Sequence, residues 1–188
     1  LLEFHRSHQL LRRGRKIVDL GCWPGGWLQV ASKCVGPKGR VVGVDKVAID
    51  PPLELPNCET MVGDLEDTGV CEQVLTLLGG PADMLLSDAA PKLTGVRAVD
   101  RALEERILEA IEVLIPLLLR EDGDLLMKIL DGPEAQVIDR RIRLMFKTAK
   151  NVKAKATRKG SSERYLYARG YRGIPAAQPP ALVSDPEA

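Results

Sequence analysis

The chain has 188 residues, 45% of them hydrophobic, and a formal net charge of +1. This length suits one domain with its own core, and no apolar run approaches the ~20 residues that a membrane-spanning helix needs. The four cysteines show no CxxC spacing, which disfavours a Cys-rich metal site and favours a reduced intracellular protein. We therefore expect one domain over residues 1–172 in the cytoplasm or an organelle matrix. A proline-rich, disordered tail is expected over residues 173–188.

The first half of the chain alternates β-type and helical patterns. Apolar β-type runs predict strands over residues 16–22, 39–45, 58–62 and 83–87. Helical patterns predict helices over residues 1–11, 25–35 and 67–78.

The second half begins with a long helix, predicted over residues 100–119 from one apolar stripe. A strand over 124–130 and a helix over 137–146 follow. Two further β-type runs, 151–156 and 164–170, are expected to pair as an antiparallel hairpin at the edge of the sheet. Alternating strands and helices indicate an α/β fold with helices on both faces of a mostly parallel sheet. Such sheets bind ligands beyond the carboxyl ends of their strands.

The turn between the first strand and its helix is rich in glycine. Its sequence, Gly21-Cys22-Trp23-Pro24-Gly25-Gly26-Trp27, lets a backbone approach a ligand where side chains would block it. The spacing differs from the GxGxxG of dinucleotide-binding folds, and no GKS or GKT follows, so bound pyrophosphate or triphosphate is disfavoured. A nucleoside that carries an amino acid, S-adenosylmethionine, suits this turn better, with Gly21 and Gly25 beside it. A purely structural turn is the alternative.

Three aspartates follow the ends of predicted strands. Asp45 can accept hydrogen bonds from two ribose hydroxyls, or it can cap its strand. Asp64 can accept a hydrogen bond from the amino group of adenine. It is equally well suited to cap the N-terminus of the segment that follows it. Asp88, in Ser87-Asp88-Ala89-Ala90-Pro91, follows a buried strand and is held by a proline, which would place it near a reacting methyl group. A simple turn aspartate is the alternative for Asp88, and we expect all three carboxylates on one rim.

Lys128 lies inside an otherwise apolar strand. Burial of an unpaired ammonium is costly, so we expect an acidic neighbour or an altered protonation state, and either makes Lys128 a catalytic candidate. Glu163 precedes a β-type run and could pair with Lys128 across neighbouring strands. The alternatives are an exposed Lys128 at a sheet edge and a surface ion pair of Glu163 with Arg158 or Arg164.

Positive charge is concentrated at two places. Residues 140–172 carry twelve basic side chains against one acidic, and residues 1–16 carry five against one. Such blocks are typical of a surface that binds a polyanion, although a solvated face is the alternative. RNA contacts are expected from Arg140, Arg141, Lys147, Arg158 and Lys159. His5 and His8 have a spacing that can bind a metal ion, but no third ligand is evident and we expect no metal.

Taken together, these residues resemble the FtsJ-like ribosomal RNA large-subunit 2′-O-methyltransferases, over about residues 1–173. Four elements in the same order carry the resemblance: Asp19-Leu20-Gly21 with Pro24-Gly25-Gly26-Trp27, then Ser87-Asp88-Ala89-Ala90-Pro91, Lys128, and Ser161-Ser162-Glu163 followed by Tyr165. Each element alone is weak evidence, and all of them in order are strong. The family's Ala-Ala-Pro is replaced here by Cys22-Trp23-Pro24, which changes the packing of the loop.

The resemblance implies a Rossmann-like fold of S-adenosylmethionine-dependent methyltransferases, with a mostly parallel seven-stranded sheet and an antiparallel edge strand. It implies cofactor contacts at Gly25, Trp27, Asp45, Asp64 and Asp88. It also implies a Lys-Asp-Lys-Glu catalytic tetrad, of which Asp88, Lys128 and Glu163 match. The first lysine of the tetrad is expected directly upstream of Leu1.

We therefore expect an enzyme that methylates a ribose 2′-hydroxyl, that of a uridine in large-subunit ribosomal RNA. Its partner would be ribosomal RNA or the large ribosomal subunit, and we expect a monomer. A 2′-O-methyltransferase of tRNA or of an mRNA cap is the alternative with the same chemistry. Retention of Asp88, Lys128 and Glu163 argues against a non-catalytic RNA-binding domain with this fold, and the basic block disfavours a small-molecule methyltransferase.

Overall fold

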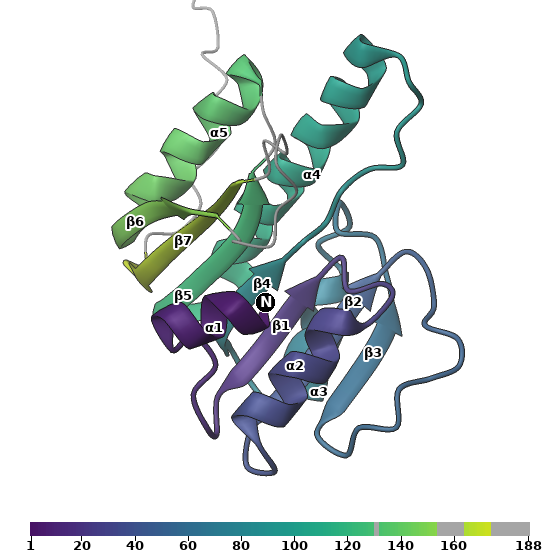
Figure 1. Ribbon diagram of the computed structural model, residues 1–188, viewed down its shortest axis with the longest axis vertical. Coiled ribbons are helices and arrows are strands. Elements are labelled where there is room, and N and C mark those ends of the chain that lie inside the picture. Colours follow the sequence, from purple (N-terminus) through teal and green to yellow (C-terminus); the bar gives the residue numbers. More distant parts are fainter. Residues whose placement is uncertain (130–131, 154–163, 174–188) are drawn as a thin grey trace, which may run out of the picture.

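The computed structural model describes residues 1–129, 132–153 and 164–173. These residues form one seven-stranded sheet with helices packed on both faces (Figure 1). The strands are β1 (Lys16–Leu20), β2 (Arg40–Asp45), β3 (Cys58–Val62), β4 (Ala82–Ser87), β5 (Leu119–Ile129), β6 (Phe146–Val152) and β7 (Arg164–Tyr171). The helices are α1 (Leu2–His8), α2 (Gly26–Val35), α3 (Val70–Leu78), α4 (Arg97–Leu118) and α5 (Pro133–Leu144).

The strands follow the order β3-β2-β1-β4-β5-β7-β6. Strands β1 to β5 pair in parallel, whereas β7 pairs antiparallel with both β5 and β6. The predicted α/β fold with a mostly parallel sheet and a β6–β7 hairpin is confirmed. The reversed strand, β7, lies one position in from the edge, and β6 forms the edge itself. The strand order reverses between β1 and β4, which is where such sheets bind their ligands.

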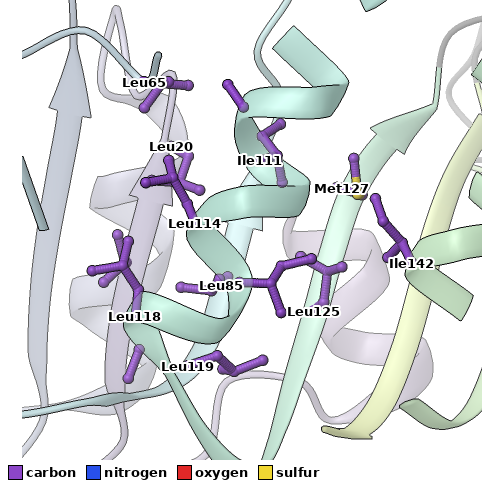
Figure 2. Packing of buried hydrophobic residues seen from close by; sticks show 14 of the residues in the cluster. Leu20, Leu65, Leu85, Ile111, Leu114, Leu118, Leu119, Leu125, Met127 and Ile142 are labelled. Atoms are coloured by element: carbon purple, nitrogen blue, oxygen red, sulfur yellow. The ribbon is translucent and has the colours of Figure 1, made fainter. Parts of the chain in front are cut away.

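Two hydrophobic clusters cover the two faces of the sheet. On one face, α3, α4 and α5 pack on the strands, and Figure 2 shows Leu114 of α4 close to Leu85 of β4. On the other face, Phe4 of α1 and Leu28 of α2 pack with Leu86 of β4. Leu85 and its neighbour Leu86 belong to opposite clusters because successive side chains of a strand point to opposite faces. The central strands are therefore buried on both sides under the helices.

The segment between β5 and β7 differs from the sequence expectation. The helix predicted over 137–146 begins four residues earlier, at Pro133, where the missing N–H of proline costs no helical hydrogen bond. The strand predicted over 151–156 begins at Phe146 and ends at Val152. Within β6, only these two terminal residues are buried. An edge strand with so many solvent-facing residues lacks the apolar pattern that marks a strand in a sequence.

The other predicted elements are confirmed, with ends that shift by at most three residues except in β5. That strand begins at Leu119, directly after α4, although its regular pairing with β4 begins at Asp124. The expected tail over residues 173–188 lies outside the described residues, apart from Gly173. No helix in the described ranges is both long and apolar enough to cross a membrane.

Candidate active site

The carboxyl ends of four parallel strands form a rim along one edge of the sheet. The register aligns Leu20 of β1 with Val44 of β2 and with Ser87 of β4, and it aligns Ser87 with Met127 of β5. Three predicted site residues each follow one of these positions directly: Asp45, Asp88 and Lys128. The sheet therefore brings them to one rim, as the sequence predicted.

Gly21 allows the loop after β1 to contact the loop after β4. Its φ is +80°, and a Cβ on it would lie 2.6 Å from the Cβ and 2.9 Å from the Cα of Ala89. Behind this contact, the N–H of Ala89 donates a hydrogen bond to Oγ of Ser87 at 3.3 Å. The turn that carries Asp88 is thus held on both sides. We expected this glycine to leave room for a ligand, and the structure shows that it leaves room for the Asp88 turn.

Asp88 and Lys128 form an ion pair, with Nζ of Lys128 3.0 Å from Oδ1 of Asp88. The lysine side chain is only 12% exposed, so the acidic neighbour that its burial requires is present. The hydroxyl of Tyr165 donates a hydrogen bond to the same oxygen at 2.9 Å. Strand β7 places Tyr165 directly opposite Lys128 in the sheet. Side chains from β5 and β7 therefore meet at one carboxylate oxygen of Asp88, the residue directly after β4.

Two aromatic rings hold Tyr165 in place. Its ring centroid lies 4.8 Å from that of Phe4 on α1 and 5.9 Å from that of Trp27 on α2. The sequence did not single out Phe4, and it used Tyr165 only within the family resemblance. A tyrosine opposite a buried lysine is the signal that could have found it, once the pairing of β5 with β7 is known. Glu163, the other expected partner of Lys128, lies outside the described residues.

The carboxylate of Asp45 is oriented by two backbone groups. The N–H of Trp23 donates to Oδ2 and the N–H of Val47 donates to Oδ1, each at 2.9 Å. A carboxylate oxygen can accept more than one hydrogen bond, so Asp45 retains capacity for ligand hydroxyls. The residues Trp23 and Val47 beside it are 57% and 55% exposed. Asp45 is thus a hydrogen-bond acceptor that the backbone holds in place, next to exposed residues on the rim.

Asp64 follows β3 and makes the capping contact considered from the sequence. Its Oδ1 accepts the N–H of Glu66 at 3.1 Å, and its Oδ2 lies 3.0 Å from Nζ of Lys46. The hydrogen bond from Glu66, with help from Lys46, lowers the pKa of Asp64 below its usual value. An ionised carboxylate in this half-exposed position can still accept a hydrogen bond from a ligand amino group.

Asp19 is buried under the rim. It is 1% exposed, and neither of its carboxylate oxygens accepts a hydrogen bond within the described residues. Burial above all, and then the charges of Asp88 and Asp45, raise the pKa of Asp19 to about 8. The negative charges of Asp88 and Asp45, which contribute to this rise, favour a cationic ligand beside them. S-adenosylmethionine carries a sulfonium and an ammonium, so the residues present fit this cofactor.

The loop between β1 and α2 is tightly packed. Gly25 has a φ of +100°, and a Cβ on it would lie 2.9 Å from Cδ1 of Leu53 and 3.2 Å from Cδ1 of Ile49. The loop after β2 therefore closes on this glycine. Cys22 is buried, and a Cβ on Gly43 would lie 2.8 Å from its Sγ. Burial raises the pKa of the Cys22 thiol to about 12, so the side chain acts as a small apolar group.

The predicted RNA-binding cations are not gathered at the rim. Arg140 and Arg141 lie on α5, and Nε of Arg141 donates to Glu112 of α4 at 2.9 Å. Lys147 follows the first residue of β6, at the end of the sheet away from the rim, and its Nζ lies 2.5 Å from Oδ1 of Asp122. Two more of these cations lie outside the described residues: Arg158 and Lys159.

His5 and His8 each make a contact within the protein. Nδ1 of His5 accepts the N–H of Leu11 at 3.1 Å, whereas the ring of His8 stacks on Tyr167. Across the ranges that the structure describes, no three His, Cys, Asp or Glu side chains are arranged to hold a metal ion.

Strand order and site together define the class of protein. Three features are typical of the Rossmann-like methyltransferases that use S-adenosylmethionine. Strand β7 is reversed next to β5, a glycine-rich turn lies at the point where the strand order reverses, and a rim of carboxylates suits a nucleoside with a positive charge. The family model for FtsJ-like methyltransferases matches residues 1–171, and the chain belongs to this family.

Curated relatives agree with this assignment. The chain is 36% identical over 174 residues to the ribosomal RNA large subunit methyltransferase E of Methanothermobacter thermautotrophicus, covering 92% of this chain and 82% of the relative. It is also 36% identical over 174 residues to the protein of that name from Pseudomonas aeruginosa, covering 92% of this chain and 83% of the relative.

Solved structures share the fold. A Plasmodium falciparum structure titled as a ribosomal RNA methyltransferase matches with a TM-score of 0.78 at 23% identity, covering 92% of this chain and 95% of that one. Aeropyrum pernix fibrillarin, solved with natively bound S-adenosyl-L-methionine, matches with a TM-score of 0.61 at 17% identity, covering 85% and 68% of the two chains.

Proposed function

We propose that the protein methylates the 2′-hydroxyl of a ribose in large-subunit ribosomal RNA, with a uridine as the target. The observation that carries this proposal is the ion pair of Lys128 and Asp88, 3.0 Å long and placed on the rim. Family membership and the names of the curated relatives support the substrate class. We further propose a monomer that acts where ribosomes assemble, in the cytoplasm or in an organelle matrix.

The reaction forms a bond from the 2′-oxygen to a methyl carbon while the bond from that carbon to sulfur breaks. When bound, S-adenosylmethionine supplies this methyl group on a positively charged sulfur. We assign the 2′-hydroxyl to Nζ of Lys128, which would orient its oxygen toward the methyl carbon, and the hydroxyl proton would pass to solvent water. Asp88 holds that amine, and Tyr165 holds Asp88. Positioning of this kind can supply much of the acceleration.

The cofactor contacts proposed from the sequence divide into acceptors and shape-forming residues. Asp45 would accept the ribose hydroxyls, Asp64 the adenine amino group, and Asp88 would lie beside the reacting methyl. Around them, the pocket would be shaped by Gly21, Gly25 and Trp27. Glu163 would complete the catalytic set by orienting the substrate ribose.

The RNA contacts proposed from the sequence are Arg140, Arg141, Lys147, Arg158 and Lys159. Arg141 and Lys147 each have an acidic partner, so an RNA phosphate would have to compete with Glu112 or with Asp122. Arg140 is exposed on α5 and meets no such competition from an ion pair within the described residues.

The test uses methyl-labelled S-adenosylmethionine and large ribosomal subunits from cells in which the gene is deleted. Labelled 2′-O-methyl groups are then mapped in the RNA, and one uridine is expected to gain label. Lys128→Ala is expected to abolish transfer while calorimetry still detects cofactor binding. Lys33→Ala, an exposed lysine on α2, is the matched control and should keep the wild-type rate.

Three outcomes would contradict the proposal in different ways. Label that appears in tRNA or in capped mRNA instead of ribosomal RNA overturns the substrate. Near-normal turnover by Lys128→Ala overturns the role of that lysine. Cofactor binding without transfer to any RNA would favour a non-catalytic RNA-binding domain.

A further inference from the structure

An exposed part of the sheet lies on the α1 face, over β6 and β7. Figure 1 shows α1 across β5, with β7 and β6 continuing the sheet beyond it. In the register, Lys150 of β6 lies opposite Tyr167 of β7, and Thr148 lies opposite Arg169. Lys150, Thr148 and Arg169 are all exposed. This surface, centred on Tyr167, is called the Tyr167 face below.

Several positive groups converge on Tyr167. Nζ of Lys150 lies 5.8 Å from the centroid of its ring, and the ring of His8 stacks on it at 5.4 Å and 25°. Burial above all, and then the charge of Asp124, raise the pKa of Tyr167, whereas the charges of Arg169, Arg15 and Arg12 lower it. Arg15 and Arg169 both approach Asp124, and the N–H of Arg15 donates to the carbonyl of Arg12 at 3.3 Å. The Tyr167 face therefore combines cations from the loop after α1 and from the two strands β6 and β7.

The positive charge of this face is only partly neutralised. Buried Asp124 pairs with Arg15 at 2.9 Å and lies 4.0 Å from Nε of Arg169, whose side chain is still 53% exposed. Arg12 and Lys150 are exposed, and no ion pair engages either of them within the described residues. Burial, and then the charge of Lys150, lower the pKa of His8, which favours the neutral form of that ring. Three cations remain directed to solvent: Arg12, Lys150 and Arg169.

The Tyr167 face lies next to the rim along β7. Tyr165 lies opposite both Lys128 and Val152, and Tyr167 is two residues further along β7. Two residues of a strand span about 7 Å, and Arg169 lies about 7 Å beyond that. An RNA strand with one ribose at Lys128 would therefore carry its neighbouring phosphates over this face within a few nucleotides. Arg141 and Lys147, by contrast, have acidic partners and lie away from the rim.

We propose that the Tyr167 face binds the phosphates of the RNA strand next to the target ribose, through Arg12, Lys150 and Arg169. This inference rests on the proposed function, because it names the surface that would hold the substrate of the same site. All three cations lie in the two basic blocks that the sequence indicated, residues 1–16 and 140–172. They are not among the individual RNA contacts expected from the sequence, which are Arg140, Arg141, Lys147, Arg158 and Lys159.

The test compares three variants that each remove two positive charges: Arg12→Gln with Lys150→Gln, Arg140→Gln with Arg141→Gln, and Lys33→Gln with Lys38→Gln as the matched control. Binding of a labelled single-stranded oligouridine is measured by fluorescence anisotropy over a range of salt concentrations. Each lost phosphate contact lowers the slope of log affinity against log salt by about 0.7, which is about fivefold in affinity at 0.1 M salt. In the first variant, the affinity for oligouridine should therefore fall about 25-fold and the slope should decrease by about 1.4. Both quantities should change little in the control.

The outcomes separate this inference from the proposed function. Suppose that the wild type methylates large subunits but the Arg12 and Lys150 variant keeps its affinity and slope. Then the RNA-binding role of the Tyr167 face is wrong and the proposed function stands. The same holds if the Arg140 and Arg141 variant alone loses affinity. If wild type transfers no methyl to ribosomal RNA, the proposed function fails first. The variant Arg12→Lys with Lys150→Arg keeps both charges and should retain RNA binding. If this variant also loses binding, the loss is not caused by the missing charges, and the proposed phosphate contacts are wrong.

Discussion

Tyr165 and Asp88 are joined by a hydrogen bond of 2.9 Å, and it ends on the carboxylate oxygen that also pairs with Lys128. The two residues are 77 positions apart in the chain. The hydroxyl therefore orients the acid, and through it the lysine amine at the rim. Tyr165 is in this sense a positioning residue, anchored by its packing on Phe4 and Trp27.

Tyr165→Phe removes this hydrogen bond and keeps the ring. A hydrogen bond to a charged group contributes about 1.5–3 kcal/mol, and water can replace part of it because the Asp88 side chain is 36% exposed. We expect kcat to fall about tenfold with little change in the affinity for cofactor. Tyr171→Phe, on the same strand but in the opposite hydrophobic cluster, is the control. A wild-type kcat and pH–rate profile for Tyr165→Phe would remove its positioning role.

Gly21→Ala should damage both the fold and the site. The substitution forces a positive φ on alanine, which costs about 1–2 kcal/mol, and it adds a Cβ 2.6 Å from Cβ of Ala89. Gly14→Ala is a matched control, because Gly14 has a φ of +79° and nothing within 4 Å of its added Cβ. Urea unfolding should show a larger loss for Gly21→Ala, and only that variant should lose methyl transfer. Equal losses in both variants would mean that the Ala89 contact is unimportant.

Asp45→Asn should weaken cofactor binding. The amide has one acceptor oxygen, whereas the carboxylate accepts the N–H groups of Trp23 and Val47 on separate oxygens. One of these donors would face an NH₂ group, and the remaining acceptor capacity for ribose would fall. We expect calorimetry to show about a tenfold higher Kd for S-adenosylmethionine or more. Asp67→Asn, in an exposed turn where Asp67 accepts the N–H of Gly69, should leave that Kd unchanged.

Asp19 should make the free energy of unfolding decrease as pH rises. Burial raises its native pKa to about 8, whereas the unfolded carboxyl ionises near pH 4. Between these values the unfolded chain binds fewer protons than the native protein, so the stability from this group is full below pH 4 and is lost toward pH 8.

Asp19→Asn replaces the protonated carboxyl by a neutral isostere and should remove this dependence. Relative to wild type, the variant should gain about 1 kcal/mol per pH unit between pH 5 and pH 7 in urea unfolding. The comparison of each protein with itself at two pH values cancels any fixed packing cost of the amide. A constant difference between the two proteins across this range would show that native Asp19 is ionised.

Local patterns determined much of the architecture. Apolar runs marked the central strands because those strands are buried on both faces, and the residues just after them were placed on one rim by parallel pairing. Lys128 was predicted to need an acidic neighbour because burial of a lone ammonium is costly, and Asp88 is that neighbour. Strand β6 was placed poorly because an edge strand carries polar side chains and lacks the apolar pattern.

The tertiary structure alone decided which distant groups share an atom or a contact. The sequence could not show that Tyr165 reaches Asp88 or that Gly21 makes room for Ala89. It also could not show that Asp19 lies beneath the rim with no hydrogen-bond partner among the described residues. Nor could it show that Arg141 and Lys147 have acidic partners whereas Arg12 and Lys150 face solvent beside Tyr167. The physical reason is that the pattern of residue types along a segment indicates which side chains are buried and which backbone conformation the segment adopts. Its partners depend on strand pairing and helix packing, which unite segments far apart in the chain.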